Sequence, residues 1–377
     1  MPVSKRTTLS DIARRAETST MAVSVVLNGA RSNTRVSDAT RRRITEIAAT
    51  LNYSPNAMAQ GLKRQRTQTI GVHFSWAGTH TIHNLYSAAV LDGIVDGAAG
   101  AGYHVLLYTV PWVSALESSV HFSDRRTDGV IVVAPGEKSD VVAGLASLGL
   151  PVTVLSSVST VPYVPYIAID NAAGARLALD HLHGLGHTRI AFAGLGQWRT
   201  SMRERHETYI TWLAEQGLPL VAEYVLADLS AGNSPQNASK FEEMLSLPDR
   251  PTALFCVTDD LATEALDAVR NVGLSVPEDV SVVGFDDILL ASLTVPKLTT
   301  VRLPLLKMGQ QAARLLIKVI EGKRDRTNED CITTPELIVR GSTTTAPTVI
   351  KRISHNDRGH TFQSQKGSDN DLRQEPH

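Results

Sequence analysis

The chain has 377 residues, a length that predicts two or three domains at roughly 150 residues each. Its residues are 42% hydrophobic and 20% charged, and its net charge is −1, which excludes a collagen-like, low-complexity or wholly disordered protein. With two cysteines, no apolar run of about 18 residues and no apolar segment behind the first residues, we expect a cytoplasmic protein without a disulfide framework, membrane span or secretory signal.

The small net charge hides an uneven distribution of charge along the chain. Residues 1–66 contain 12 Lys and Arg against 4 Asp and Glu, a net charge of +8, and the other 311 residues have a net charge of −9. Such a split indicates one segment that binds nucleic acid and another with a different task.

The first predicted helix has apolar residues at i, i+3, i+4 and i+7, namely Leu9, Ile12, Ala13 and Ala16. Glu17 and Thr18 form a turn, and Ser19 is the expected N-cap of a second helix that stops at Asn28 and Gly29. The residues expected to face inward in the second helix are Val23, Val26 and Leu27. The residues expected to face outward are Thr20, Met21, Ser24 and Val25.

A third predicted helix follows its expected N-cap, Ser37. Its apolar stripe consists of Ile44, Ile47, Ala48 and Leu51. Its outer face carries Arg41, Arg42 and Arg43. Two helices joined by a tight turn and braced by a third are typical of a helix-turn-helix, although periodicity alone also fits a small structural three-helix module.

A short helix is expected next, starting at Pro55, because proline suits a first helical turn. It would span about seven residues, fewer than the ~12–15 that an isolated helix needs in water, and Gly61 weakens it further. We therefore expect this helix to need a partner to stay folded. The basic residues Lys63, Arg64 and Arg66 follow it.

From Thr69 onward, expected strands alternate with expected helices such as Leu85–Gly100 and Ala172–Leu185. The strands are Ile70–Phe74, Val105–Tyr108, Gly129–Val133, Val152–Leu155, Ile167–Ile169, Ile190–Ala193, Ala253–Val257 and Val280–Phe285, with weaker runs at Leu298–Val301 and Leu337–Val339. This order predicts an α/β protein with mostly parallel sheets. So many strands favour two lobes with a ligand crevice between them. The polar end of the chain is expected to be disordered.

Two local patterns suggest cofactor or metal chemistry that their surroundings do not support. Gly194 and Gly196 follow a strand, but Arg199 stands where a dinucleotide-binding loop has its third glycine, which favours a plain turn. His181, His183 and His187 do not share a helix face, which argues against a metal site. We therefore expect no catalytic residue, no cofactor and no metal.

Two pairs of adjacent carboxylates, Asp259-Asp260 and Asp286-Asp287, each follow an expected strand. Such pairs could hold a metal or act as acid and base. Neighbouring residues on a strand point in opposite directions, however. We therefore expect one carboxylate of each pair to face a cleft.

A series of motifs runs in order from about Thr7 to Thr345. In the N-terminal part these are Thr8–Ala13, Ser19–Ser24, Val26–Gly29, Val36–Arg41, Leu51–Asn56, Ala59, Leu62 and Ile70–Val72. Further on they are Asp170-Asn171, Gly174-Ala175, His181-Leu182, Leu185–His187, Arg203–Arg205, Asp279–Asp287, Leu298–Val301 and Arg340–Ser342. Together they resemble the LacI family of bacterial transcription regulators.

The resemblance implies three parts. These are an all-α helix-turn-helix headpiece (residues 1–54), a hinge helix and linker (55–66) and an α/β core of two lobes like periplasmic sugar-binding proteins (67–345). Residues 346–377 are the polar tail that its composition predicts to be disordered. It implies a homodimeric repressor that binds pseudo-palindromic operator DNA. A small molecule in the cleft, a sugar or sugar derivative in the favoured reading and a nucleobase or other metabolite in the alternative, would change operator affinity.

The resemblance also assigns residues that contact DNA. In the recognition helix they are Thr20, Met21, Ser24 and Val25, and in the hinge they are Asn56, Ala59 and Leu62. Many family members carry Arg where this chain has Val25, so contacts with thymine methyl groups are expected to outweigh bidentate hydrogen bonds. Leu62 is expected to wedge open a base step in the minor groove. Glu17 replaces the usual turn glycine.

For the cleft, the resemblance assigns Arg205, Asp286, Tyr86, Thr258 and Asp259 to the ligand. A guanidinium can donate two hydrogen bonds to hydroxyls or a carboxylate, and a carboxylate accepts hydroxyl protons. An aromatic ring can stack on a ligand. Thr258 stands where relatives usually have Asn.

An enzyme and a stand-alone sugar-binding protein are the two alternatives. An enzyme is disfavoured because the chain has no nucleophile–base set and no cofactor loop. A binding protein would leave the segment with a charge of +8 without a task. The sequence leaves open whether the effector releases or tightens DNA binding, and whether the oligomer is larger than a dimer.

Overall fold

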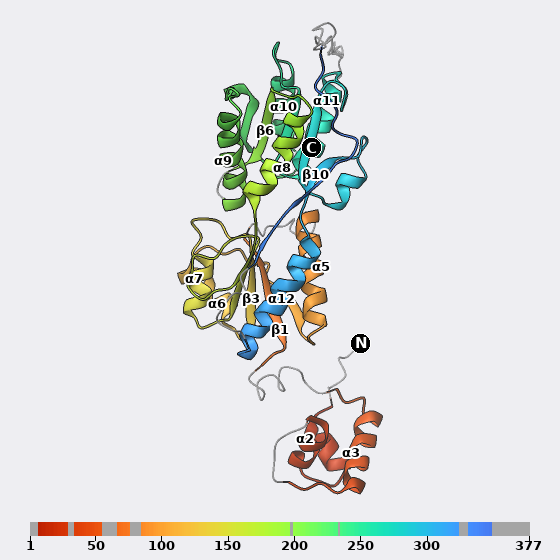
Figure 1. Cartoon of the computed structure of the whole chain (residues 1–377). Helices are drawn as coiled ribbons and strands as arrows, with labels where there is room; N and C mark the ends of the chain where they lie inside the picture. The colour runs from red at the N-terminus through yellow and green to blue at the C-terminus, as the bar shows by residue number, and fades with distance from the viewer. Residues whose placement is uncertain are drawn as a thin grey trace, which may run out of the picture.

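The structure is a computed structural model, and it describes residues 7–28, 34–54, 66–75, 84–196, 199–232, 234–323 and 331–348. Three N-terminal helices form a small unit, and the rest folds into two α/β lobes (Figure 1). The predicted fold class, an all-α headpiece followed by a two-lobed α/β core, is confirmed. The expected hinge helix and the tail beyond residue 348 lie outside the described residues.

The headpiece consists of α1 (Leu9–Arg15), α2 (Thr20–Asn28) and α3 (Asp38–Thr50). Both expected N-caps form: Ser19 Oγ accepts from the Ala22 amide at 3.1 Å, and Ser37 Oγ accepts from the Thr40 amide at 3.3 Å. Glu17 has a φ of 50°, so it takes the left-handed conformation that glycine adopts at lower cost. The apolar stripes meet in one core made of Ile12, Ala13, Ala16, Val23, Ile44 and Ala48.

The first lobe contains a parallel sheet of six strands in the order β11-β5-β4-β3-β1-β2. In chain order the strands are β1 (Thr69–Phe74), β2 (His104–Leu107), β3 (Gly129–Val133), β4 (Val152–Leu155), β5 (Tyr166–Ile169) and β11 (Cys331–Thr333). The helices packed on it are α5 (Leu85–Ala99), α6 (Ala115–Phe122), α7 (Val141–Ser147) and α12 (Leu305–Glu321). β3 and β4 are wholly buried, as expected for central parallel strands covered on both faces.

The second lobe repeats this plan with the strand order β12-β10-β9-β8-β6-β7. In chain order its strands are β6 (Ile190–Leu195), β7 (Val225–Leu229), β8 (Ala253–Cys256), β9 (Ser281–Asp286), β10 (Thr299–Arg302) and β12 (Glu336–Ile338). All pairs are parallel except the one between β10 and the edge strand β12. Its helices are α8 (Asn171–Gly184), α9 (Thr200–Glu215), α10 (Pro235–Leu245) and α11 (Asp259–Asn271), with short 3-10 helices η2 (Ala222–Tyr224) and η3 (Leu289–Ser292).

Two of these strands, β7 and β11, were not predicted from the sequence. Both are at sheet edges, and their residues are mostly half-buried or exposed. An edge strand lacks the continuous apolar run of a central strand, so its sequence carries a weak signal. β11 is also only three residues long.

The chain passes between the lobes three times, at the β5–α8, β10–α12 and β11–β12 connections. After the second passage, α12 returns to the first lobe and lies against α5 (Figure 1). The two helices approach so closely that a Cβ atom on Gly309 would lie 2.3 Å from the Val90 carbonyl oxygen. Among the described residues, no helix is both long and apolar enough to cross a membrane.

Candidate functional site

One face of α2 is available to a partner of the headpiece. Thr20 and Met21 are exposed, with Met21 at 51%, and Ser24 and Val25 are half-buried. The opposite face, with Ala22 and Val23, is buried in the headpiece core. The helix therefore presents a small, weakly polar surface that can make van der Waals contacts with base edges.

The neighbouring helix α3 carries positive charge. Arg41, Arg42 and Arg43 of α3 are all exposed, as their place outside the apolar stripe predicts. Such guanidinium groups suit phosphate oxygens. The other expected DNA contacts, Asn56, Ala59 and Leu62, lie outside the described residues.

A second candidate site lies in the second lobe and is centred on Arg205 of α9. Its side chain is buried, with a residue exposure of 2%. Nε donates to Asn171 Oδ1 at 3.0 Å, and Nη1 donates to the Val257 carbonyl oxygen at the end of β8. The guanidinium lies 3.5 Å from the centroid of the Phe285 ring. These contacts hold the cation in a defined orientation.

Asp286 at the end of β9 is the anionic partner of this arginine. Its Oδ1 lies 3.9 Å from Arg205 Nη1. Burial raises the pKa of Asp286 to about 7, although the Arg205 charge favours the ionised form. The carboxyl group can therefore gain or lose a proton near neutral pH. Its φ of 111° is rare for a residue other than glycine, and such strain is frequent at binding sites.

Tyr86 of α5 contributes to the site from the first lobe. Its hydroxyl donates to Ser156 Oγ at 2.5 Å, and it lies within electrostatic range of Asp286 and Arg205 in the second lobe. Burial raises the pKa of Tyr86 to about 12, so the phenol remains neutral at physiological pH. The two lobes thus face each other across groups of complementary chemistry.

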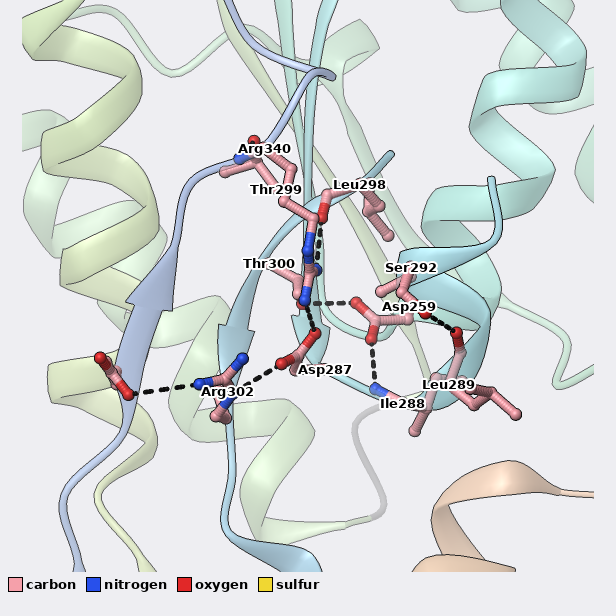
Figure 2. Close-up of polar contacts among 12 residues, drawn as sticks. Asp259, Asp287, Ile288, Leu289, Ser292, Leu298, Thr299, Thr300, Arg302 and Arg340 are labelled. Atoms are coloured by element: carbon pink, nitrogen blue, oxygen red, sulfur yellow. Dashed lines mark hydrogen bonds and ion pairs between the residues drawn. The ribbon is translucent and has the colours of Figure 1, made fainter. Parts of the chain in front are cut away.

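Thr258 and Asp259 start α11 beside this site. Thr258 Oγ1 caps the helix by accepting from the Leu261 amide at 3.2 Å. The Asp259 carboxylate accepts from the Ile288 amide at 2.9 Å and from Thr300 Oγ1 (Figure 2), and the residue has no exposed surface. Both oxygens are thus used inside the second lobe. A ligand contact for Asp259 stays a prediction, and its observed contacts are those of a residue that holds the β9–η3 turn.

The strand below this carboxylate has a matching glycine. A Cβ atom on Gly284 would lie 2.3 Å from Asp259 Oδ1, so a larger residue would displace the carboxylate. Burial raises the pKa of Asp259 well above its ordinary range. This tight packing fixes the Asp259 carboxylate against β9.

Asp287 has a different neighbourhood from the adjacent Asp286. Its two oxygens accept from Arg302 Nε and Arg340 Nη2, each at 2.6 Å (Figure 2). Arg302 ends β10, immediately before the chain passes to the first lobe. Asp287 therefore ties together the strand ends at a lobe connection. Asp286 faces Arg205.

Two of the three histidines considered as metal ligands, His181 and His187, have structural hydrogen-bond partners. His187 is buried, and its ring nitrogens are within hydrogen-bond distance of the Thr252 and Ser281 hydroxyls. His181 is similarly placed beside Thr343. In the part of the chain that the structure describes, no group of His, Cys, Asp and Glu side chains is arranged to hold a metal ion.

Several residues of the site were not predicted as such. They are Asn171, which orients Arg205; Phe285, which stacks under it; Ser156, which pairs with Tyr86; and Arg199, which lines a neighbouring pocket. That pocket has a volume of about 320 Å³ and lies at the carboxyl ends of β6 and β7. For Asn171 and Phe285 a signal existed, since both belong to the motifs that suggested the family.

Comparisons with known proteins agree with this architecture. Residues 8–56 match the pattern of bacterial regulatory proteins of the lacI family, and residues 179–343 match the periplasmic binding protein-like domain. The HTH-type transcriptional repressor PurR of Mannheimia succiniciproducens is 30% identical over 339 residues, which are 89% of this chain and 98% of that protein.

Two solved structures are similar over most of the chain. The lac repressor dimer bound to operator and the anti-inducer ONPF has a TM-score of 0.77 and 28% identity, covering 90% of this chain and all of that one. A complex of the transcriptional regulator CelR with cellobiose has a TM-score of 0.66 and 28% identity, covering 89% of this chain and all of that one.

Proposed function

The chain belongs to the lacI family of bacterial regulatory proteins, and we propose that it is a transcriptional repressor whose affinity for a pseudo-palindromic operator changes when a sugar-like effector binds between its lobes. One observation carries the ligand part of this proposal: the buried Arg205–Asp286 pair faces Tyr86 of the other lobe. An ion pair and a neutral phenol together provide donors and acceptors for a polyhydroxylated molecule.

In the headpiece, Thr20, Met21, Ser24 and Val25 would meet base edges in the major groove, and the exposed arginines of α3 would contact phosphates. A palindromic operator calls for two headpieces related by two-fold symmetry, so the active form would be a homodimer. The lac repressor, a structural relative, is described as a dimer on its operator. The hinge residues Asn56, Ala59 and Leu62 would add minor-groove contacts.

In the core, Arg205, Asp286, Tyr86 and Thr258 would contact the effector, with Asp259 holding the turn that presents Asp286. The effectors of two structural relatives, cellobiose for CelR and the anti-inducer ONPF for the lac repressor, support a ligand site in this fold. Since the relatives are repressors, we propose no catalytic activity for this chain. Coupling to DNA would arise from different effector affinities of two lobe arrangements.

The test is a selection of DNA from a randomised pool with the full chain, followed by quantitative binding to the enriched site. We expect a palindromic consensus bound with nanomolar affinity, as is typical of specific protein–DNA complexes. Titration with a panel of sugars should then shift operator affinity at least about tenfold for one member. If the selection enriches no DNA sequence, the proposed sequence-specific DNA binding is contradicted. Enrichment with no response to any small molecule would contradict the effector role alone.

A further inference from the structure

One wall of the pocket at the carboxyl ends of β6 and β7 is a short exposed segment. Leu229 ends β7, and Ser230 and Ala231 follow it in the pocket lining. Ser230, Ala231 and Gly232 are all exposed, and Gly232 has a φ of 86°, a conformation that glycine adopts freely. Burial of side chains therefore does little to hold this segment in place. Its position depends instead on its polar contacts.

Asn237, in the first turn of α10, supplies these polar contacts. Its Oδ1 accepts from the Ser230 amide at 3.0 Å, and its Nδ2 donates to the Ser230 carbonyl oxygen at 2.9 Å. Nδ2 also donates to Glu264 Oε2 at 2.8 Å. Asn237 has an exposure of only 1%. Its carbonyl oxygen and both of its N–H groups thus have partners, a set that aspartate could not provide because it has no donor.

Two packed helices fix the position of this amide. The apolar face of α10 is buried in the core of the second lobe, and α10 packs against α11, which carries Glu264. Burial raises the pKa of the half-buried Glu264, and its hydrogen bond with Asn237 opposes that shift by favouring the carboxylate. The N-cap of α11 is Thr258, and its first residue is Asp259. Asn237 therefore ties the pocket wall to the helix that begins at the cleft.

The pocket adjoins the Arg205–Asp286 pair. Tyr86 of the first lobe lies within electrostatic range of that pair and of Arg199, which lines the pocket. A ligand held by the pair can therefore extend into the pocket, whose volume of about 320 Å³ is in the range of small-ligand sites. The room for that extension depends on where residues 229–231 stand.

We propose that Asn237 is a positioning residue that sets the size of ligand admitted to the cleft, because its three hydrogen bonds hold residues 229–231 at a fixed place in the pocket wall. This inference rests on the proposed function, since it concerns the selectivity of that effector site. Asn237 acts through the wall and does not itself touch the ligand. A wall without this amide can move, so ligands of different length are discriminated less.

The experiment measures how well the full chain distinguishes a monosaccharide from a disaccharide. Isothermal titration gives the Kd of D-glucose against cellobiose and of D-galactose against lactose, and the ratio within each pair is the discrimination. We expect a ratio of about tenfold or more for at least one pair in the wild type. Asn237→Ala should bring this ratio at least about threefold closer to one, whichever sugar is preferred. A purely structural role would weaken both sugars equally and leave the ratio unchanged.

A second pair of variants tests the hydrogen bonds directly and does not depend on the stability of Asn237→Ala. Asn237→Asp keeps the shape and the acceptor, but it loses both donors and places a second carboxylate beside Glu264. It should lose the discrimination. Adding Glu264→Gln returns a donor between the two side chains, so the double variant should recover part of the ratio. Thermal unfolding of each variant accompanies the titrations.

Asn271→Ala is the matched control. Asn271 Nδ2 donates to Glu242 Oε1 at 3.1 Å, so it joins the same two helices at an exposed place and should leave the ratio unchanged. An unchanged ratio in the folded Asn237 variants, no recovery in the double variant, an equal loss in Asn271→Ala, or no binding of the four sugars to the wild type would overturn the inference. In each of these cases, a sugar that shifts operator affinity leaves the proposed function intact.

Discussion

Arg203 of the second lobe forms an ion pair with Glu137 of the first lobe, with 3.1 Å between Arg203 Nη2 and Glu137 Oε1. Arg203 is two residues from Arg205 on α9, and Glu137 follows β3. The same guanidinium also lies 3.6 Å from Glu207, one helical turn along α9. One arginine therefore has a partner in each lobe. This arrangement links the position of the lobes to the helix that carries Arg205.

Glu137→Gln should weaken effector binding, because it removes the ion pair that joins the lobes. The partners are 36% and 46% exposed, so the loss is expected to be below about 1 kcal/mol, or up to about fivefold in affinity. Glu207→Gln is the control, since it removes the same charge from a pair within one helix. Titration calorimetry measures the effector affinity of both variants. Equal losses of affinity would show that the Glu137 ion pair has no special link to lobe position.

Arg205→Ala should abolish the effector response while operator binding persists, because the headpiece has its own core. It also leaves Asp286 buried without its partner, which costs on the order of 3 kcal/mol where the carboxylate is ionised. Thermal unfolding should therefore accompany the binding assay. Arg205→Lys retains the charge but loses the planar set of donors. It should therefore be more stable than Arg205→Ala and still show a weak response to the effector. A normal response in both variants would reject the assignment.

Effector affinity should increase as the pH rises from 6 to 8, because the ionised Asp286 carboxylate accepts hydroxyl protons and its pKa is about 7. The contribution of Asp286 to the free energy of unfolding has the opposite pH dependence. A carboxyl whose folded-state pKa is raised contributes stability that is fully present below about pH 4 and is lost as the pH rises through 7. Asp286→Asn should flatten both profiles. A wild-type affinity that is constant across this range would contradict the role of Asp286.

Asp128→Asn should weaken the coupling between effector and operator. The Asp128 carboxylate accepts from the Thr67 amide at 2.6 Å, the Thr67 hydroxyl at 2.9 Å and the Gln68 amide at 2.8 Å, where the chain enters the first lobe. Loosening this anchor should leave each binding affinity near normal but reduce the shift in operator affinity that the effector causes by a few fold. Asp124→Asn, at an exposed pair with Arg126, is the control. Intact coupling in Asp128→Asn would show that the anchor only stabilises the chain entry.

Leu62→Ala should reduce binding to the selected operator far more than binding to random DNA, because a wedge contributes only where the DNA is kinked at the correct step. Arg42→Gln, which removes an exposed charge on α3, should weaken both by similar factors and reduce their salt dependence. Fluorescence anisotropy on both DNAs separates the two behaviours. Equal losses on both DNAs for Leu62→Ala would end the case for the wedge.

The headpiece could be read from the sequence because its signals are local. The stripe of Ile12, Ala13 and Ala16 repeats within eight residues, and the caps Ser19 and Ser37 act on amides three residues away. Central strands such as β3 were equally clear, since a strand buried on both faces is apolar throughout. The half-buried edge strands β7 and β11 lacked that pattern.

The residues assigned to the cleft could not be predicted from local sequence patterns. Arg205 and Asp286 were proposed because motifs resembled a family, and no spacing in the chain relates them. Their surroundings are made by contacts between residues far apart: Asn171 is 34 residues from Arg205, Val257 is 52 residues away, and Ser156 is 70 residues from Tyr86. The roles of Arg199 and of the Arg203–Glu137 pair also depend on this distant packing.

The sequence by itself therefore determined the order of parts, the helix-turn-helix and the α/β class, because periodicity, capping and charge act over a few residues. Only the tertiary structure decided that Asp286 and not Asp287 meets Arg205, which residues orient Arg205, and which ion pair joins the lobes. Those outcomes depend on strand order and on three chain passages between the lobes, which bring distant side chains within hydrogen-bond distance. Burial in that packing also sets the pKa of Asp286 near neutrality.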